Sequence, residues 1–290
     1  MLKEYLNEKK IIVEANLKER LSSYNSPSRL SEAMTYSVMN GGKRIRPIIM
    51  YMICDLFDMK YDKIEDLAVA LEFIHCYSLV HDDLPAMDND MYRRGKLTTH
   101  IKFDEATAIL AGDTLLTEAF CIIAKSIKIP QNKKALIIAK LSEYAGFYGM
   151  IGGQYMDIES ENKKVDYETL KYIHDNKTGK LLTAAVELPL ICLDIDEKNT
   201  RKLLEYSKLI GIAFQIKDDI LDIEGDFDKT GKKSSDIINE KTTYPSIFGI
   251  DRSKELLDEY VIKAKNILTE YYSENKILIE LTEYFGYRGE

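Results

Sequence analysis

One stretch of the chain places four carboxylates within nine residues and two arginines directly after them. These residues are Asp82, Asp83, Asp88, Asp90, Arg93 and Arg94. Like charges this close together repel, and a hard divalent cation would offset the repulsion. Carboxylates that share a metal with waters and phosphate oxygens are typical of Mg²⁺, and arginine offers forked donors to phosphate. The stretch therefore indicates either a magnesium–phosphate site or a solvated acidic loop.

A second stretch repeats the pattern on a predicted helix. Gln215, Asp218, Asp219 and Asp222 share one face at helical spacing, and residues 203–214 before them are apolar on nearly all sides. A helix of that kind is buried, and buried carboxylates need a partner, usually a metal. Two such helices facing each other would form a metal cage for the phosphates of a substrate.

The remaining sequence predicts the long helices that would carry these side chains. Apolar residues recur at helical spacing over about 1–22, 29–40, 47–56, 64–82, 104–127, 133–158, 167–189, 197–223 and 253–285. No alternation typical of strands persists, and no linker, repeat or low-complexity segment interrupts the chain. The fold class predicted is all-α, with residues 1–290 as a single domain.

The charge, the cysteine spacing and the apolar runs of the sequence exclude several classes of protein. The net charge of −8 argues against nucleic acid as a partner, while leaving anionic substrates possible through local lysines and arginines. The four cysteines form no C-x-x-C pair, so we expect a reducing compartment rather than a zinc or dithiol site. The charged N-terminal stretch has no signal-like apolar core, and no uncharged apolar run is long enough for a membrane span. These features predict a cytoplasmic protein.

Taken together, the motifs resemble those of the trans-isoprenyl diphosphate synthases, and within them the bacterial-type farnesyl diphosphate synthases. The first stretch resembles the Asp-Asp-x4-Asp motif followed by Arg-Arg-Gly, and the second resembles Asp-Asp-x-x-Asp after Phe-Gln. Four further matches occur in the family's order: Gly41–Pro47, Gly153–Asp157, Lys177–Gly179 and Lys241–Pro245. The resemblance spans residues 41 to 245, and the combination is far more specific than any one motif.

The resemblance implies a helical bundle with a central cavity lined by the two aspartate-rich helices. It also implies transfer of an allylic group, from dimethylallyl or geranyl diphosphate, to isopentenyl diphosphate. The expected cofactor is Mg²⁺, three ions per site, and the expected assembly is a homodimer. Such chemistry requires charge to stabilise the departing diphosphate, and it requires exclusion of water from the carbocation.

Roles for single residues also follow from the resemblance. The metal ligands would be Asp82, Asp83, Asp88, Asp218 and Asp222, and the groups on the allylic diphosphate would be Arg93, Lys177, Lys232 and Lys241. Thr178 and Gln215 would lie beside the ionising carbon. Isopentenyl diphosphate would be bound by Lys43, Arg46, His75 and Arg94. Without the resemblance, His75 would be taken as a core histidine, and Lys43 and Arg46 as surface charges.

Product length depends in this family on the helix before the first aspartate motif. Tyr77 stands five residues before Asp82, at the position that limits chain growth in relatives, which implies farnesyl diphosphate as the product. Helical geometry alone places Ser78, rather than Tyr77, beneath Asp82. The alternative is a geranylgeranyl diphosphate synthase, and an ordinary core role for Tyr77 also remains open.

Three other classes of protein were weighed. A di-iron bundle needs two E-x-x-H motifs, and only Glu72–His75 supplies one. A terpene cyclase would not need the Lys43–Arg46 loop or Arg-Arg-Gly, since it takes one substrate. A non-catalytic subunit would typically lack an aspartate motif, and this chain contains both.

Overall fold

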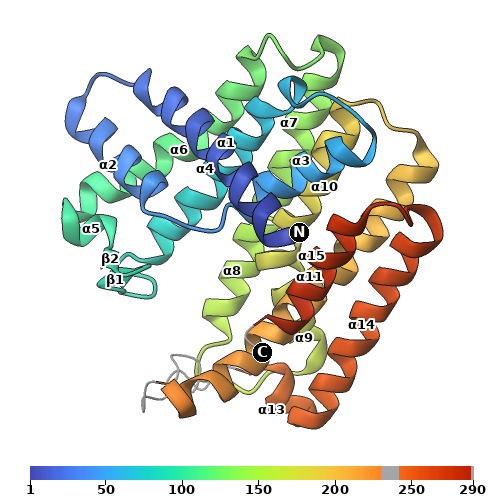
Figure 1. The fold of residues 1–290 in the computed structure, drawn as a ribbon. Coiled ribbons are helices and arrows are strands. Elements are labelled where there is room, and N and C mark those ends of the chain that lie inside the picture. Colours follow the sequence, from blue (N-terminus) through green and yellow to red (C-terminus); the bar gives the residue numbers. More distant parts are fainter. Residues whose placement is uncertain (230–241, 289–290) are drawn as a thin grey trace. The chain divides into compact units, whose positions relative to one another are not determined.

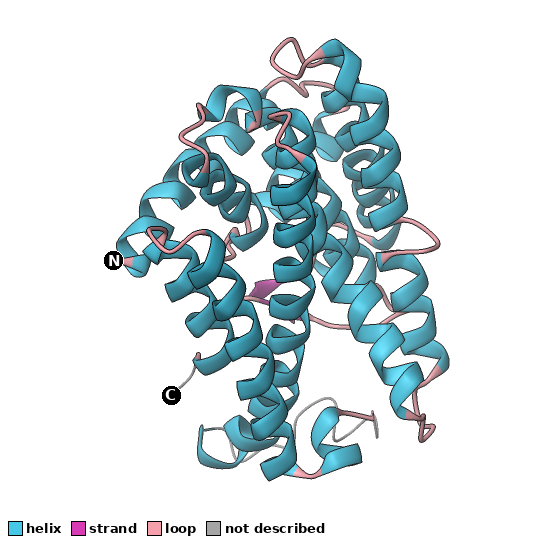
Figure 2. Ribbon diagram, turned by 90° about the vertical axis from the view of Figure 1, so that its right-hand side faces the viewer, coloured by secondary structure: helices cyan, strands magenta, loops and turns pink. Residues whose placement is uncertain are grey.

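The structure, a computed structural model, consists almost entirely of helices, as Figure 2 shows. It describes the backbone of residues 1–229 and 242–288, and the side chains of 1–224 and 242–288. The chain divides into two compact units. The first is formed by Lys3–Leu141 with Leu188–Asp194, and the second by Ser142–Glu187 with Ile195–Glu290. The predicted all-α fold class is confirmed.

The first unit contains most elements of the N-terminal half. They are α1 (Leu2–Ser22), α2 (Ser28–Met39), α3 (Ile45–Leu56), η1 (Tyr61–Lys63), α4 (Glu65–Asp82), β1 (Tyr92–Arg93), β2 (Lys96–Leu97), α5 (Thr99–Lys102), α6 (Glu105–Lys125) and most of α7 (Gln131–Ala145). Helix α4 is the core of this unit, because its residues from Asp66 to Phe73 are all buried. Helix α6 runs beside it (Figure 1). Consequently α4 carries the first aspartate motif on a well-supported helix end.

Helix α6 is long and apolar enough to meet the length and hydropathy criteria for a membrane span. Only 39% of its most apolar window is buried, and Asp113 and Glu118 lie within the helix. The Asp104 side chain caps its first turn by accepting the Thr107 N–H at 2.7 Å. The helix packs on α4 and α2. One helix of this kind is weak evidence for a membrane.

The second unit is built around the long helix α11. Its elements are α8 (Met150–Glu159), α9 (Tyr167–Ile173), the π-helical turn η2 (His174–Gly179), most of α10 (Lys180–Cys192), α11 (Glu197–Lys229), α13 (Tyr244–Phe248), α14 (Ile250–Tyr271) and α15 (Lys276–Tyr287). Helix α11 contacts α14, α15, α13 and η2, and Figure 1 shows α14 beside it. A core cluster that includes Ile216, Ile220, Tyr244 and Val261 holds α11 against α13 and α14.

Three helix predictions were too simple. The helix expected over 133–158 is broken at 146–149, where Gly146 and Gly149 weaken helix formation. The helix expected over 167–189 contains the π-helical turn η2, which periodicity alone does not reveal. Helix α11 continues to Lys229, six residues beyond its predicted end at 223. A two-residue β-hairpin, β1–β2, was also unforeseen.

Candidate active site

The first aspartate motif begins at the end of α4, where the chain turns back on itself. The Asp88 N–H donates to the Asp82 carbonyl at 2.9 Å, and the Asn89 N–H donates to the Leu84 carbonyl at 3.1 Å. Asn89 adopts a left-handed conformation, with φ of 52°. This turn brings the backbones of Asp82 and Asp88 together, although they are six residues apart. Asp82 is half-buried and Asp88 is exposed, so both could meet a ligand that enters from solvent.

Asp83 takes a different position from Asp82. Its side chain is only 4% exposed, and its Oδ1 accepts from Nε and Nη2 of Arg93, both at 2.6 Å. Burial raises the pKa of the Asp83 carboxyl, and the Arg93 guanidinium opposes that shift. Within the first aspartate motif, the Asp83 carboxylate is therefore held by Arg93 of the same protein.

The β1–β2 hairpin presents Arg94 to a neighbouring loop. Arg94 and Gly95 form its turn with φ of 54° and 74°. From there the Arg94 guanidinium donates to the Gly41 carbonyl. A Cβ on Gly42 would lie 2.6 Å from Arg94 Nη1, and Gly42 has φ of 119°. Only glycine fits that position, so the double glycine that precedes Lys43 lets this loop approach Arg94 closely.

A cluster of cationic and imidazole groups surrounds this contact. Arg44 is fully buried and is neutralised by Glu72 at 2.7 Å. Arg46 has a buried Nε without a hydrogen-bond partner, and burial lowers the pKa of Arg46. Burial also lowers the pKa of Arg94, as does the nearby Arg44. The pKa of His75 lies well below its usual value because of burial and then Arg46 and Arg94. An excess of positive charge with an unsatisfied donor is the environment that an anion would stabilise.

Tyr77 lies on α4 one turn and a half before Asp82. Its side chain is buried, its hydroxyl has no hydrogen-bond partner, and its ring meets the His81 ring edge-on at 5.8 Å between centroids. Burial and then the Asp82 charge raise the pKa of its phenol. The Tyr77 ring therefore lies close enough to the first aspartate motif for the charge of Asp82 to affect the pKa of its phenol.

The second aspartate motif lies on α11 in the other unit, and its adjacent aspartates differ in exposure. The Asp218 side chain is 40% exposed, whereas that of Asp219 is 4% exposed. Asp219 accepts the Tyr244 N–H at 2.9 Å and Gln215 Nε2 at 3.2 Å. The predicted shared face is thus divided: Asp219 is held within the unit, and Asp218 is more accessible.

Asp218 forms an ion pair with Arg288, which follows α15. The same guanidinium donates to the Phe214 carbonyl at 3.0 Å and to the Phe285 carbonyl at 2.7 Å. It also lies over the Phe214 ring, 3.9 Å from the centroid. Arg288 is therefore firmly fixed on a carboxylate that was predicted to bind metal. Sequence reasoning missed it, because no motif marks the segment after α15.

The π-helical turn η2 positions Lys177 and Thr178. Lys177 Nζ lies 2.6 Å from Asp157 on α8. A Cβ on Gly153 would lie 2.2 Å from the Lys177 N, so glycine lets α8 pack directly on the turn. π-Helical turns often occur at functional sites, because they present side chains that an α-helix would direct elsewhere. Asp157, the last residue of the Gly153–Asp157 match, therefore contacts Lys177 directly.

A cavity of about 120 Å³ in the second unit collects several of these groups. Three of the predicted site residues, Lys177, Thr178 and Gln215, line it together with Asp219 and Asp157. His174 also lines it and was not predicted, since nothing in its local sequence marks it. Burial lowers the pKa of His174 to about 3, so its imidazole is neutral, stacks on Tyr244, and forms no ion pair with Asp219, 3.8 Å away. Lys232 and Lys241, also predicted here, lie outside the described residues.

The donor set suits a hard cation. The predicted ligands Asp82, Asp88, Asp218 and Asp222 offer only carboxylate oxygens, and each is at least partly accessible. Across residues 1–224 and 242–288, no three acidic, histidine or cysteine side chains are grouped so that they could hold a metal by themselves. Mg²⁺ commonly uses one or two carboxylates together with waters and substrate phosphates, so the residues fit this ion.

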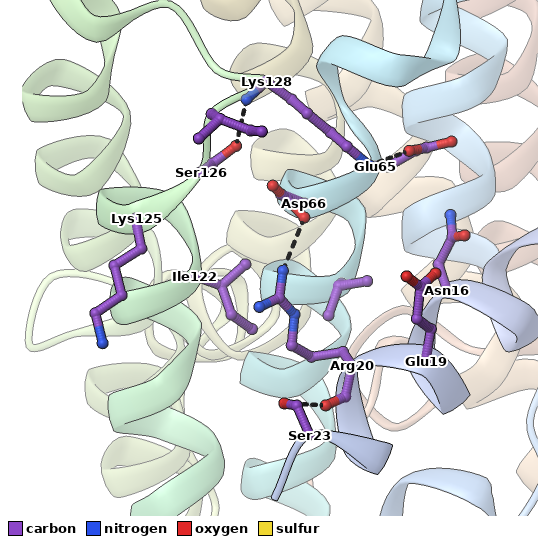
Figure 3. A pocket seen from close by; sticks show the side chains of 12 residues that line it. Asn16, Glu19, Arg20, Ser23, Glu65, Asp66, Ile122, Lys125, Ser126 and Lys128 are labelled. Carbon is purple, nitrogen blue, oxygen red and sulfur yellow. Dashed lines mark hydrogen bonds and ion pairs between the residues drawn. The ribbon is translucent and has the colours of Figure 1, made fainter.

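Another cavity, of about 350 Å³, lies in the first unit away from the predicted residues (Figure 3). Asp66 on its wall contacts Arg20 at 3.1 Å, and Glu65 contacts Lys128 at 2.6 Å. Val69 and Ile122 contribute apolar surface. Because these opposite charges already compensate one another, this cavity lacks the excess positive charge found around Arg46.

Comparison with known proteins shows the family of this chain. The family described as Polyprenyl synthetase matches residues 27–276. A farnesyl diphosphate synthase of Bacillus subtilis is 40% identical over 99% of this chain and 98% of its own. A geranylgeranyl diphosphate synthase of Cyanophora paradoxa is 43% identical over 94% and 91%. The crystal structure of a geranyltransferase from Legionella pneumophila superimposes with a TM-score of 0.89 at 35% identity, covering 100% and 98%.

The chain therefore belongs to the polyprenyl synthetase family. The predicted family is confirmed, and with it the prediction of a prenyl-transferring enzyme.

Proposed function

We propose that the protein is a farnesyl diphosphate synthase. It would join dimethylallyl and then geranyl diphosphate to isopentenyl diphosphate. The observation that carries this proposal is the presence, in one chain, of two aspartate motifs and a separate cationic cluster around Arg46 and Arg94. One diphosphate would be bound through metal and the other through basic side chains without metal, as a two-substrate reaction requires. The extent of similarity to farnesyl diphosphate synthases supports the same conclusion.

The allylic diphosphate would be bound by residues from both motifs. Asp82, Asp88, Asp218 and Asp222 would hold Mg²⁺, three ions in all, and Asp83 would support them. Mg²⁺ supplies the positive charge that a departing diphosphate needs. Arg93 and Lys177 would add fixed cations, and so would Lys232 and Lys241. Thr178 and Gln215 would place oxygen dipoles beside the carbon that becomes positive.

Isopentenyl diphosphate would be bound by the cationic cluster, with Lys43 and His75 beside Arg46 and Arg94. The lowered pKa of His75 keeps its imidazole neutral near neutral pH, so it would act as a hydrogen-bonding group. We expect Arg46→Ala to raise the Michaelis constant for isopentenyl diphosphate about 10- to 100-fold, since a charge-assisted contact is lost. The constant for geranyl diphosphate should change much less. Equal changes in both constants would contradict this assignment.

The proposed product is the C15 compound, and Tyr77 carries this part of the proposal. Its buried ring would block a growing chain beneath the motif, after two additions to dimethylallyl diphosphate. The second candidate is a geranylgeranyl diphosphate synthase. It is supported by a relative of that name that is 43% identical to this chain.

The decisive experiment is incubation of purified protein with Mg²⁺, dimethylallyl diphosphate and excess labelled isopentenyl diphosphate. Chromatography of the dephosphorylated products should give mainly C15 alcohol for wild type and longer alcohols for Tyr77→Ala. Tyr77→Phe, which keeps the ring, is the matched control and should still give C15. No transfer at all would refute the function, whereas mainly C20 from wild type would refute the product length alone.

The proposal includes a cytoplasmic homodimer in which residues 1–290 act as a single domain. Support for a second copy comes from exposed apolar side chains on two helices of the first unit. Ile109 and Leu110 on α6 are 43% and 56% exposed, and Leu136 on α7 is 49% exposed. Burying them against a second copy removes apolar surface from water. Light scattering at working concentration should report about twice the chain mass, and a monomer would refute the assembly.

A further inference from the structure

Asp219 is the most enclosed carboxylate of the second motif, and both of its oxygens accept hydrogen bonds from the protein. Its side chain is 4% exposed. It accepts the Tyr244 main-chain N–H at 2.9 Å through Oδ2 and Gln215 Nε2 at 3.2 Å through Oδ1. Oδ2 thus accepts from the main chain, and Oδ1 accepts from the Gln215 amide. Its neighbour Asp218 is ten times more exposed and pairs with Arg288.

The contact with Gln215 determines which way that amide faces. A glutamine amide has an NH₂ donor on one side and an oxygen acceptor on the other, and either can rotate into a given position. A carboxylate can only accept, so it selects the NH₂ side. With Nε2 held by Asp219, Gln215 Oε1 must point away from the carboxylate. Gln215 and Asp219 both line the cavity that also contains Lys177 and Thr178.

We propose that Asp219 is a positioning residue that fixes the orientation of the Gln215 amide, rather than a ligand for metal. This inference rests on the proposed function, in which Gln215 Oε1 stabilises positive charge on the allylic carbon. The inverted amide would present N–H groups instead, and their partial positive charge would oppose ionisation.

The surroundings of Asp219 favour a fixed position. Tyr244 is 1% exposed and belongs to the core cluster with Ile216 and Ile220 on α11. Thr243, just before it, forms a capping box with Ser246. The His174 ring stacks on Tyr244 at 5.6 Å between centroids. The Tyr244 N–H is thus held by packing, and it holds Asp219 against rotation toward solvent.

A double-mutant cycle tests whether Asp219 acts through Gln215. Asp219→Asn keeps the shape, but its amide can be oriented to donate to Gln215 as well as to accept from it. We expect kcat to fall about 10- to 100-fold, with the Michaelis constants and the Mg²⁺ requirement little changed. In a Gln215→Ala background the same substitution should lower kcat less than about 3-fold.

Asp218→Asn is the matched control, because it alters the adjacent carboxylate that is predicted to bind metal. It should raise the Mg²⁺ concentration needed for half-maximal rate. If Asp219→Asn behaves in the same way and recovers at high Mg²⁺, Asp219 is a metal ligand and the inference is overturned. An undiminished effect of Asp219→Asn in the Gln215→Ala background would overturn it equally.

A measurement on wild-type protein keeps the test decisive if Asp219→Asn does not fold. The side-chain amide of Gln215, identified by the NMR signal that Gln215→Ala lacks, should exchange with solvent more slowly than an exposed glutamine. Exchange at the exposed rate would refute the contact. Wild-type turnover is a separate readout: its absence refutes the proposed function, while the NMR result still decides the contact with Asp219.

Discussion

The two aspartate motifs are built alike and stabilised differently. In each adjacent pair the second aspartate is enclosed by protein, since the side chains of Asp83 and Asp219 are both 4% exposed. The first aspartate of each pair, Asp82 or Asp218, remains partly accessible. Asp83 pairs with the positive charge of Arg93, whereas Asp219 accepts hydrogen bonds from a main-chain N–H and a side-chain amide.

This difference suggests a division of labour within each motif. A helix cannot direct two adjacent side chains to one point, because successive residues are about 100° apart around the axis. One carboxylate of each pair can therefore face a ligand while the other supports the site from behind. Asp83 supports a cation and Asp219 supports an amide, so substitutions at the two positions should fail in different ways.

The largest expected effect comes from the accessible aspartates. Asp82→Ala and Asp218→Ala should each lower kcat by about 10³-fold or more, because charge that stabilises the departing diphosphate is lost. Steady-state kinetics at saturating Mg²⁺ measures this, and wild type in excess EDTA should be comparably inactive. Near-normal turnover in EDTA would mean that the motifs do not act through metal.

The next effect separates the two supporting aspartates by stability. Asp83→Asn removes the carboxylate nearest to the half-buried Arg93 and leaves it the more distant Asp90 at 3.9 Å, so the free energy of unfolding should fall by about 2 kcal/mol. Asp219→Asn can still accept the Tyr244 N–H and should cost only about 1 kcal/mol. Urea denaturation of both variants measures the difference. If the two variants lost equal free energy of unfolding, Asp83 and Asp219 would not differ in how strongly their partners stabilise the fold.

A smaller effect concerns pH, through His174 beside Asp219. The folded pKa of about 3 lies below the ordinary value of 6.5, so the unfolded chain takes up a proton first as the pH falls. This group therefore removes stability below pH 6.5, by about 2 kcal/mol at pH 5. His174→Gln should lose correspondingly less stability between pH 7.5 and pH 5. If wild type were instead more stable than His174→Gln at pH 5, His174 would be a cation paired with Asp219.

The smallest effect concerns Arg288, which pairs with Asp218. A guanidinium and a metal ion would compete for the Asp218 carboxylate. We expect Arg288→Ala to lower the dissociation constant of Mg²⁺, measured calorimetrically with inorganic pyrophosphate, by about 3- to 10-fold. Arg288→Lys keeps the charge but loses the planar stack on Phe214. Its dissociation constant for Mg²⁺ should lie between those of wild type and Arg288→Ala. Weaker Mg²⁺ binding in Arg288→Ala would indicate that the arginine assists the site.

The sequence by itself determined the family, the helical class and the positions of both aspartate motifs. Apolar residues at helical spacing predicted α4 and α11, because a helix places apolar side chains on the faces that it packs against its neighbours. The double glycine predicted the loop before Lys43, since only glycine adopts its conformation there. Arginines and carboxylates in fixed order predicted phosphate and metal chemistry from residue types alone.

Tertiary structure decided which partner each aspartate of the two motifs contacts. Helical spacing placed Asp218 and Asp219 on one face, but their different roles depend on Tyr244 and Arg288, which are 25 and 70 residues away in the chain. The π-helical turn at Lys177 depends on the close approach of Gly153 from another helix. Contacts of this kind join residues that no local pattern links. For that reason the sequence could specify the chemistry, while only packing could assign each carboxylate its partner.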